Sequence, residues 1–179
     1  MRPSALLSAV VIAACASGNS GPAESPHPQS TVTRAGGSDL RTGASDGPHT
    51  TTVSFPVDSV FKALPAIYAS LGLPLTVMDP RQHTLGNQGM KIRQKLAKVP
   101  LSRYIDCGST QGMASADSYE VILSVVTHVR AAEPAGSDIA TTVNASAKPM
   151  QFAQDYAKCG TTGALENRIY ELIKASFNK

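Results

Sequence analysis

The strongest structural signal in the chain is the stretch YEVILSVVTHVR, residues 119–130, in which apolar and polar side chains alternate. A period of two is typical of a β-strand with one buried face. That face would carry Tyr119, Val121, Leu123, Val125, Thr127 and Val129. Residues 139–148, IATTVNASAK, alternate in the same way, and the connector 131–138 contains Pro134 and Gly136. We therefore expect the two stretches to form an antiparallel hairpin, around which the domain is built.

Two helical patterns and several shorter strands flank this hairpin. Residues 51–57 predict a strand, and Asp58 is the expected N-cap of a first helix that contains Pro65 and ends before Gly72. Residues 75–78, 90–96 and 102–107 predict further strands, and apolar spacing predicts a second helix over 165–177. The order strand, helix, several strands, helix predicts an α+β fold, with an antiparallel sheet that carries both helices on one face.

The first 15 residues have the pattern of an export signal. Arg2 precedes the apolar run ALLSAVVI, residues 5–12, which is too short to cross a bilayer because that takes ~20 apolar residues. The run ends in Ile12-Ala13-Ala14-Cys15, which resembles a bacterial lipobox, where the cysteine is diacylated and becomes the mature N-terminus. Two alternatives stay open. An ordinary signal peptidase could remove Cys15 and release a soluble protein, or the segment could be a buried cytosolic helix.

Residues 16–50 are rich in Gly, Pro, Ser and Thr and contain no aromatic residue. This composition buries too little apolar surface to offset chain entropy, so we expect a disordered tether. The expected organisation is a lipoprotein signal peptide at 1–14, the lipidated Cys15 and its tether at 15–50, and a globular domain at 51–179. Ala16 stands where Gram-negative lipoproteins of the inner membrane commonly carry Asp. The resemblance therefore implies an anchor on the periplasmic face of the outer membrane.

The remaining cysteines fit an exported protein. Once Cys15 is lipidated or removed, Cys107 and Cys159 are left as an even pair in an oxidising compartment. We expect a disulfide between them, which would close a loop of about 50 residues and contribute ~4 kcal/mol. Two buried, unpaired thiols are the alternative. Neither cysteine has the spacing or the nearby histidine that a zinc site requires.

The sequence carries no recognisable catalytic or cofactor-binding motif. It contains no phosphate-binding loop, no dinucleotide-binding fingerprint and no His-Glu-x-x-His pair. His83 and His128, the histidines of the predicted domain, are expected to be structural or surface residues. We expect no metal and no cofactor, and the formal net charge of +3 is too small to favour nucleic-acid binding.

One charge pattern is a candidate contact surface. Lys91, Arg93 and Lys95 alternate on one face of the predicted strand 90–96, so their charges could add up to a basic stripe. A solvated outer face that lysines protect from edge pairing is one interpretation. The functional interpretation is attraction to anionic envelope polymers, lipid head groups or an acidic partner.

Three motifs of the domain resemble a family of uncharacterised bacterial envelope lipoproteins. They are RYIDCG at 103–108, the long strand at 119–130, and Cys159-Gly160 followed by Leu165-Glu166. The element order also resembles, in topology alone, the helix-grip domains of an accessory lipoprotein in the outer-membrane β-barrel assembly machinery. The resemblance covers about 51–179 and implies no known activity.

These observations favour a non-enzymatic lipoprotein, anchored to the membrane through its N-terminal lipid. Its tethered domain would bind an envelope protein as an accessory or assembly factor. A carrier that holds a small apolar ligand between the sheet and the C-terminal helix is the first alternative. An envelope hydrolase is the second.

Overall fold

The computed structural model describes residues 47–151 and 153–178, so the expected signal peptide, Cys15 and most of the expected tether lie outside the described residues. The described residues form an α+β fold with a seven-stranded sheet and three α-helices. The helices are α1 (Val57–Ser70), α2 (Ser115–Ser118) and α3 (Ala164–Phe177). The strands of the sheet are β1 (His49–Val53), β2 (Val77–Asp79), β3 (Thr84–Arg93), β6 (Ile105–Asp106), β9 (Glu120–Ala132), β10 (Gly136–Lys148) and β11 (Ala157–Thr161).

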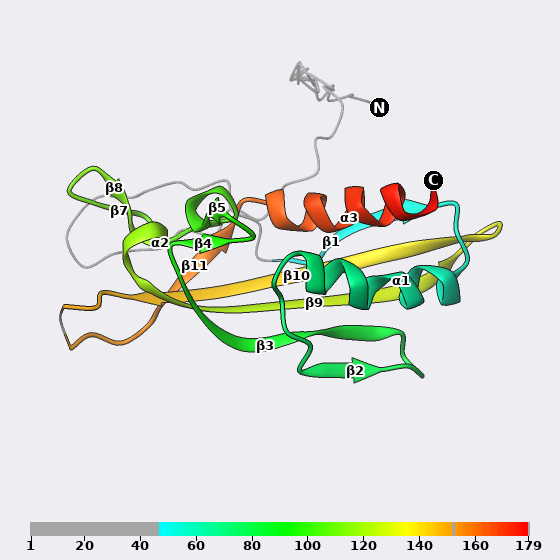
Figure 1. The fold of residues 1–179 in the computed structure, drawn as a ribbon, viewed down its shortest axis with the longest axis horizontal. Helices are drawn as coiled ribbons and strands as arrows, with labels where there is room; N and C mark the ends of the chain where they lie inside the picture. Colours follow the sequence, from blue (N-terminus) through cyan, green and yellow to red (C-terminus); the bar gives the residue numbers. More distant parts are fainter. Residues whose placement is uncertain (1–46, 152, 179) are drawn as a thin grey trace, which may run out of the picture.

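Strands β9 and β10 form the predicted hairpin and cross the whole sheet (Figure 1). They pair antiparallel over their full length, with Val125 opposite Val143 at the centre. Burial alternates along both strands, so that Val121, Leu123 and Val125 are fully covered while their neighbours in sequence are partly exposed. The period-two pattern of the sequence therefore identified the strand and its buried face correctly.

The sheet order is β2-β3-β9-β10-β11-β6, and each of these neighbouring pairs is antiparallel. Strand β1 pairs with the first half of β10, opposite Ser137 to Thr141. Strand β11 pairs with the second half of the same edge, opposite Ala145 to Ala147. Two short hairpins, β4 (Lys95–Leu96) with β5 (Val99–Pro100) and β7 (Ser109–Thr110) with β8 (Met113–Ala114), lie outside this sheet.

Helices α1 and α3 lie side by side on the same face of the sheet (Figure 1). Their apolar stripes face the buried side chains of β9 and β10, and the fully buried helical residues include Val60, Leu64, Leu165, Ile169 and Ile173. The packing confirms the prediction of two helices on one face. No helix in the described ranges combines the length and the apolar content that crossing a membrane requires.

The boundaries of the first strand and helix differ from the prediction. Strand β1 begins at His49 and ends at Val53, because the chain turns into α1 at Pro56. Pro56 occupies the N-cap position, and Asp58 lies in the first helical turn, so the N-cap prediction was wrong. Proline is tolerated at the start of a helix, where its missing N–H has no partner to lose. The helix continues through Pro65.

The region between the helix and the hairpin differs more. Strand β3 begins at Thr84, six residues before the predicted strand, and ends at Arg93 because Gln94 has a φ of +62°. The predicted strand 102–107 is instead a 3₁₀ turn, η1 (Leu101–Arg103), followed by β6. Strands β7, β8 and β11 and helix α2 were not predicted, because they are two to five residues long and carry no extended periodic pattern.

Candidate functional site

The predicted disulfide joins Cys107 to Cys159, with a Cα–Cα separation of 4.4 Å. The two cysteines stand one position beyond the last residue pair between β6 and β11, Asp106 with Gly160. The Asp106 carboxylate accepts a hydrogen bond from the Gly108 backbone N–H (2.8 Å), which stabilises the turn after Cys107. A structural disulfide of this kind indicates an oxidising, exported environment. The bridge links the edge strand β6 to its neighbour β11.

Among the described residues, no long helix packs on the face of the sheet opposite α1 and α3, which we call the open face. The register of the sheet places residues from distant parts of the chain in rows on this face. Arg93 of β3, Glu120 of β9 and Lys148 of β10 are consecutive partners in one row. The next row consists of Lys91, Ile122, Ser146 and Lys158. Four basic side chains and the Glu120 carboxylate therefore share these two rows at one end of the open face. We call Lys91, Arg93, Lys148 and Lys158 the basic end.

The predicted basic stripe is only partly realised. Lys91 and Arg93 are exposed and share the open face, as predicted. Lys95 does not continue the stripe, because the positive φ of Gln94 ends β3 and places Lys95 in the separate β4–β5 hairpin. The structure supplies Lys148 and Lys158 instead, from strands more than 50 residues further along the chain. The structure pairs Lys148 with Glu120 across the predicted hairpin, whose register the sequence analysis left open.

Glu120 is the centre of a polar network at the basic end. Its carboxylate accepts hydrogen bonds from the Arg93 guanidinium (2.8 Å) and the Tyr156 hydroxyl (2.5 Å), and Lys148 Nζ lies 4.0 Å away. The hydrogen bond from Arg93 and then that from Tyr156 lower the pKa of Glu120 to about 2. Lys148 also lies over the Tyr156 ring, 4.8 Å from its centroid. Glu120 therefore stays ionised near neutral pH and holds the Arg93 guanidinium by a direct ion pair.

Small and apolar side chains occupy the middle of the open face. Beyond the basic end the rows pair Ser124 with Asn144, and Gly86 with Val126 and Thr142. Ile122 and Val126 are partly exposed and point away from the core cluster beneath the helices. A Cβ at Gly86 would overlap the Val125 carbonyl oxygen and lie 2.7 Å from the Val126 Cα, so glycine permits this close approach of β3 to β9. The middle of the face consequently carries small and uncharged side chains.

No protein-family model matches this sequence, and no curated protein is significantly similar to it. The resemblance to envelope lipoproteins therefore rests on the quoted motifs. The side chains of the chain itself therefore provide the evidence for its chemistry.

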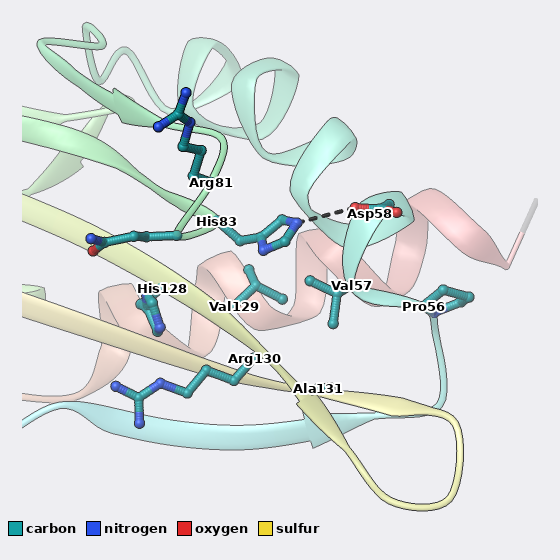
Figure 2. A pocket seen from close by; sticks show the side chains of 10 residues that line it. Pro56, Val57, Asp58, Arg81, His83, His128, Val129, Arg130 and Ala131 are labelled. Carbon is teal, nitrogen blue, oxygen red and sulfur yellow. Dashed lines mark hydrogen bonds and ion pairs between the residues drawn. The ribbon is translucent and has the colours of Figure 1, made fainter.

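At the other end of the sheet, the turn between β2 and β3, the start of α1 and the end of β9 line a cleft of about 590 Å³ (Figure 2). His83 Nε2 lies 3.1 Å from Asp58 Oδ1, and the His83 ring packs edge-on against Phe61. Arg81 and Arg130 also line the cleft, but their guanidinium groups extend away from it in different directions (Figure 2). The cleft therefore does not focus positive charge on one point.

The second histidine of this cleft, His128, contacts a hydroxyl group of the neighbouring strand. His128 Nδ1 lies 2.6 Å from the Thr84 hydroxyl, and the two residues are direct partners in the β3–β9 ladder. Burial, followed by the charges of Arg130 and His83, lowers the pKa of His128, which favours its neutral form. In the described part of the chain, no group of three or more His, Cys, Asp or Glu residues could hold a metal ion. The contact between Thr84 and His128 is accounted for as a pair of directly opposed cross-strand side chains.

Proposed function

We propose that this protein is a non-enzymatic bacterial envelope lipoprotein, lipidated at Cys15, whose domain binds an envelope protein as an accessory or assembly factor. The lipobox-like Ile12–Cys15 stretch and the Cys107–Cys159 bridge support the exported location. The identity of the residue after Cys15, Ala16, supports the outer membrane. The observation that carries the binding role is the open face of the sheet.

This face has the make-up of a protein interface. The partly exposed Ile122 and Val126 contribute some apolar surface, and the basic end around Glu120 borders them on one side. With strands ~4.8 Å apart and ~3.3 Å per residue, the rows from Glu120 to Arg130 cover on the order of 600 Å². Specific interfaces bury about 800 Å² per partner. We infer that the partner presents a flat, neutral surface bordered by acidic residues.

Photo-crosslinking in intact cells tests the binding role. A photoreactive amino acid at Ser124, in the middle of the open face, should repeatedly trap one envelope protein that mass spectrometry identifies. The matched control carries the same group at Ala175, which is exposed on α3 on the opposite side of the sheet. Recovery of no protein from Ser124, or of the same proteins from both positions, would contradict the proposal.

The lipid anchor has a separate test. The Cys15→Ser variant should lose its membrane association or accumulate with an uncleaved signal peptide. Fractionation of intact and variant protein measures both outcomes. Unchanged fractionation would rule out lipidation at this residue.

The two alternative functions have weaker support. A carrier with a cavity between the sheet and α3 needs space there, yet Leu165, Ile169 and Ile173 on that face are fully buried. A hydrolase needs a nucleophile, a base and an oxyanion site within reach of one another. The pair of Thr84 and His128 supplies the first two types without a carboxylate that orients the histidine.

A further inference from the structure

A second cleft lies on the helix side of the sheet, away from the open face. It has a volume of about 510 Å³ and is walled by the end of α1, the β4–β5 hairpin, η1 and α3 from Ala164 to Leu172. Volumes of about 300–1,000 Å³ are typical of small-molecule sites. The cleft is therefore of the size that holds one small ligand rather than a helix or strand of a partner protein.

The inner surface of this cleft is apolar. Leu71 and Tyr104 are buried members of the core and form its base, and the partly exposed Val99 and Leu172 line its sides. Ser70 also lines the cleft, but its hydroxyl donates a hydrogen bond to the Ile67 carbonyl oxygen (2.7 Å). A ligand that covers this surface gains the free energy of removing apolar area from water.

Two arginines, Arg103 and Arg168, line the same cleft and are exposed. Neither guanidinium forms an ion pair with a carboxylate of the described residues. In contrast, Arg93 at the basic end is engaged by Glu120. Guanidinium groups bind carboxylates and phosphates through paired hydrogen bonds, so two unpaired ones beside an apolar surface select an anionic group.

Hydrogen bonds hold the backbone segments that carry both arginines. The Asp117 carboxylate fixes η1 by accepting hydrogen bonds from the Ser102 N–H (2.9 Å) and hydroxyl (2.6 Å), and the Thr162 hydroxyl donates to the Arg103 carbonyl oxygen (2.8 Å). Arg168 follows the first turn of α3. That turn is held by the Thr161 hydroxyl, which donates to Glu166 Oε1 (2.7 Å). The backbone that carries each arginine is therefore fixed, which lowers the entropy lost there when a ligand binds.

The hairpin that walls the cleft carries backbone strain. Ala97 and Lys98, at its tip, have φ angles of +49° and +69°. Left-handed conformations are costly for residues other than glycine, and they concentrate at ligand-binding and functional sites. Ala97 itself lines the cleft. The strain therefore coincides with the apolar surface and the two unpaired arginines.

We propose that this cleft binds one anionic amphiphile, a molecule with a carboxylate or phosphate head and an aliphatic body. Arg103 and Arg168 hold the head, and the surface formed by Leu71, Val99, Tyr104 and Leu172 covers the body. The site is independent of the open face, so it adds a ligand to the proposed binding role without depending on that role.

Calorimetric titration of the full, disulfide-bonded chain with dodecanoate, kept below its micellar concentration, tests the site. One molecule should bind per chain. Arg103→Gln and Arg168→Gln should each weaken binding about tenfold or more, because each removes charged hydrogen bonds to the head. Dodecanol, which lacks the charge, should bind as weakly to the unaltered chain as dodecanoate binds to these variants. Dodecyl phosphate tests whether the cleft accepts a phosphate head in place of a carboxylate. Inorganic phosphate tests whether the head group binds without an aliphatic body.

Arg81→Gln and Arg130→Gln are the matched controls, because these two arginines line a cleft of similar volume at the other end of the sheet. They should leave the affinity within twofold. The proposal is overturned if dodecanoate and dodecyl phosphate both fail to bind, if the control variants weaken binding as much as the test variants, or if a short acidic peptide binds at this cleft and the amphiphiles do not. Crosslinking at Ser124 reports on the open face alone, so the two proposals can fail separately.

Discussion

At the scale of single residues, Glu120 has the clearest link between geometry and pH. Its pKa of about 2 lies below the value of an unfolded glutamate, so its ionised form stabilises the folded state. This contribution is fully present above about pH 4.5 and is lost as the pH falls towards 2. Glu120→Gln should therefore lower the urea midpoint at pH 7, and its difference from the unaltered protein should shrink on acidification and vanish near pH 2.

The control for this prediction is Glu171→Gln. Glu171 forms an exposed pair with Lys174 at 3.7 Å on α3, and such pairs contribute little. A pH dependence of equal size in both variants would show that general surface charge, rather than the network around Glu120, is responsible.

The pKa of Tyr68 is raised by the fold, whereas that of Glu120 is lowered. Burial raises its pKa to about 12, while its hydroxyl lies 2.8 Å from the Thr127 hydroxyl, which in turn lies 2.9 Å from that of Thr141. Tyr68→Phe should cost about 1 kcal/mol at pH 7, because it removes one buried hydrogen bond. An acid with a raised folded pKa stabilises the fold below its unfolded pKa of 10.0 and loses that contribution as the pH rises towards 12. The variant should consequently become relatively more stable above pH 10.

Urea unfolding of both proteins at pH 7, 9 and 11 measures this crossover. Tyr170→Phe is the matched control, since the Tyr170 hydroxyl has no hydrogen-bond partner among the described residues. A cost that stays constant from pH 7 to 11 would mean that Tyr68 ionises as easily in the folded state as in the unfolded one.

At the scale of elements, Gly86 sets the spacing between β3 and β9. An added Cβ would overlap backbone atoms of Val125 and Val126, and backbone cannot yield as a flexible side chain does. Gly86→Ala should therefore lower the free energy of unfolding by about 2–3 kcal/mol. The loss should appear as a lower urea midpoint. Gly47→Ala is the control, because nothing lies within 4 Å of its added Cβ, and it should be close to neutral.

The elements also show what could be predicted from the sequence. The β9–β10 hairpin and α3 have long periodic patterns, so their existence and their buried faces follow from the sequence, whereas the pairing of Glu120 with Lys148 required the structure. The predicted strand 90–96 missed the first half of β3, because Gly86 and Gly89 interrupt the apolar pattern there. Gly86 is nevertheless needed for the close packing of β3 against β9. Lys158 could not be assigned to the basic end, because β11 is short and its pairing with β10 is a tertiary contact. The cleft with Arg103 and Arg168 joins elements whose relative placement no local pattern encodes.

At the scale of the whole molecule, the disulfide limits the freedom of the unfolded chain. It joins residues 52 positions apart, and closing a loop of that length stabilises the folded state by about 4 kcal/mol in the chain-entropy model. The double variant Cys107→Ser/Cys159→Ser should lose roughly this amount in urea unfolding. Dithiothreitol should destabilise the unaltered protein by a similar amount and leave the double variant unchanged. Equal stability of the oxidised and reduced proteins would contradict the prediction.

The position of β1 has a mechanical consequence. A pull exerted through the N-terminal part of the chain enters the domain at His49, the first residue of a five-residue strand that pairs with β10. A strand loaded at its free end opens one residue pair at a time, beginning at His49 opposite Thr141. Peeling β1 away would release about 17 Å of extended chain, and the pairs of the β9–β10 hairpin and of β6 with β11 do not involve β1. Strand β1 would thus detach from β10 before the pulling force unfolds the core.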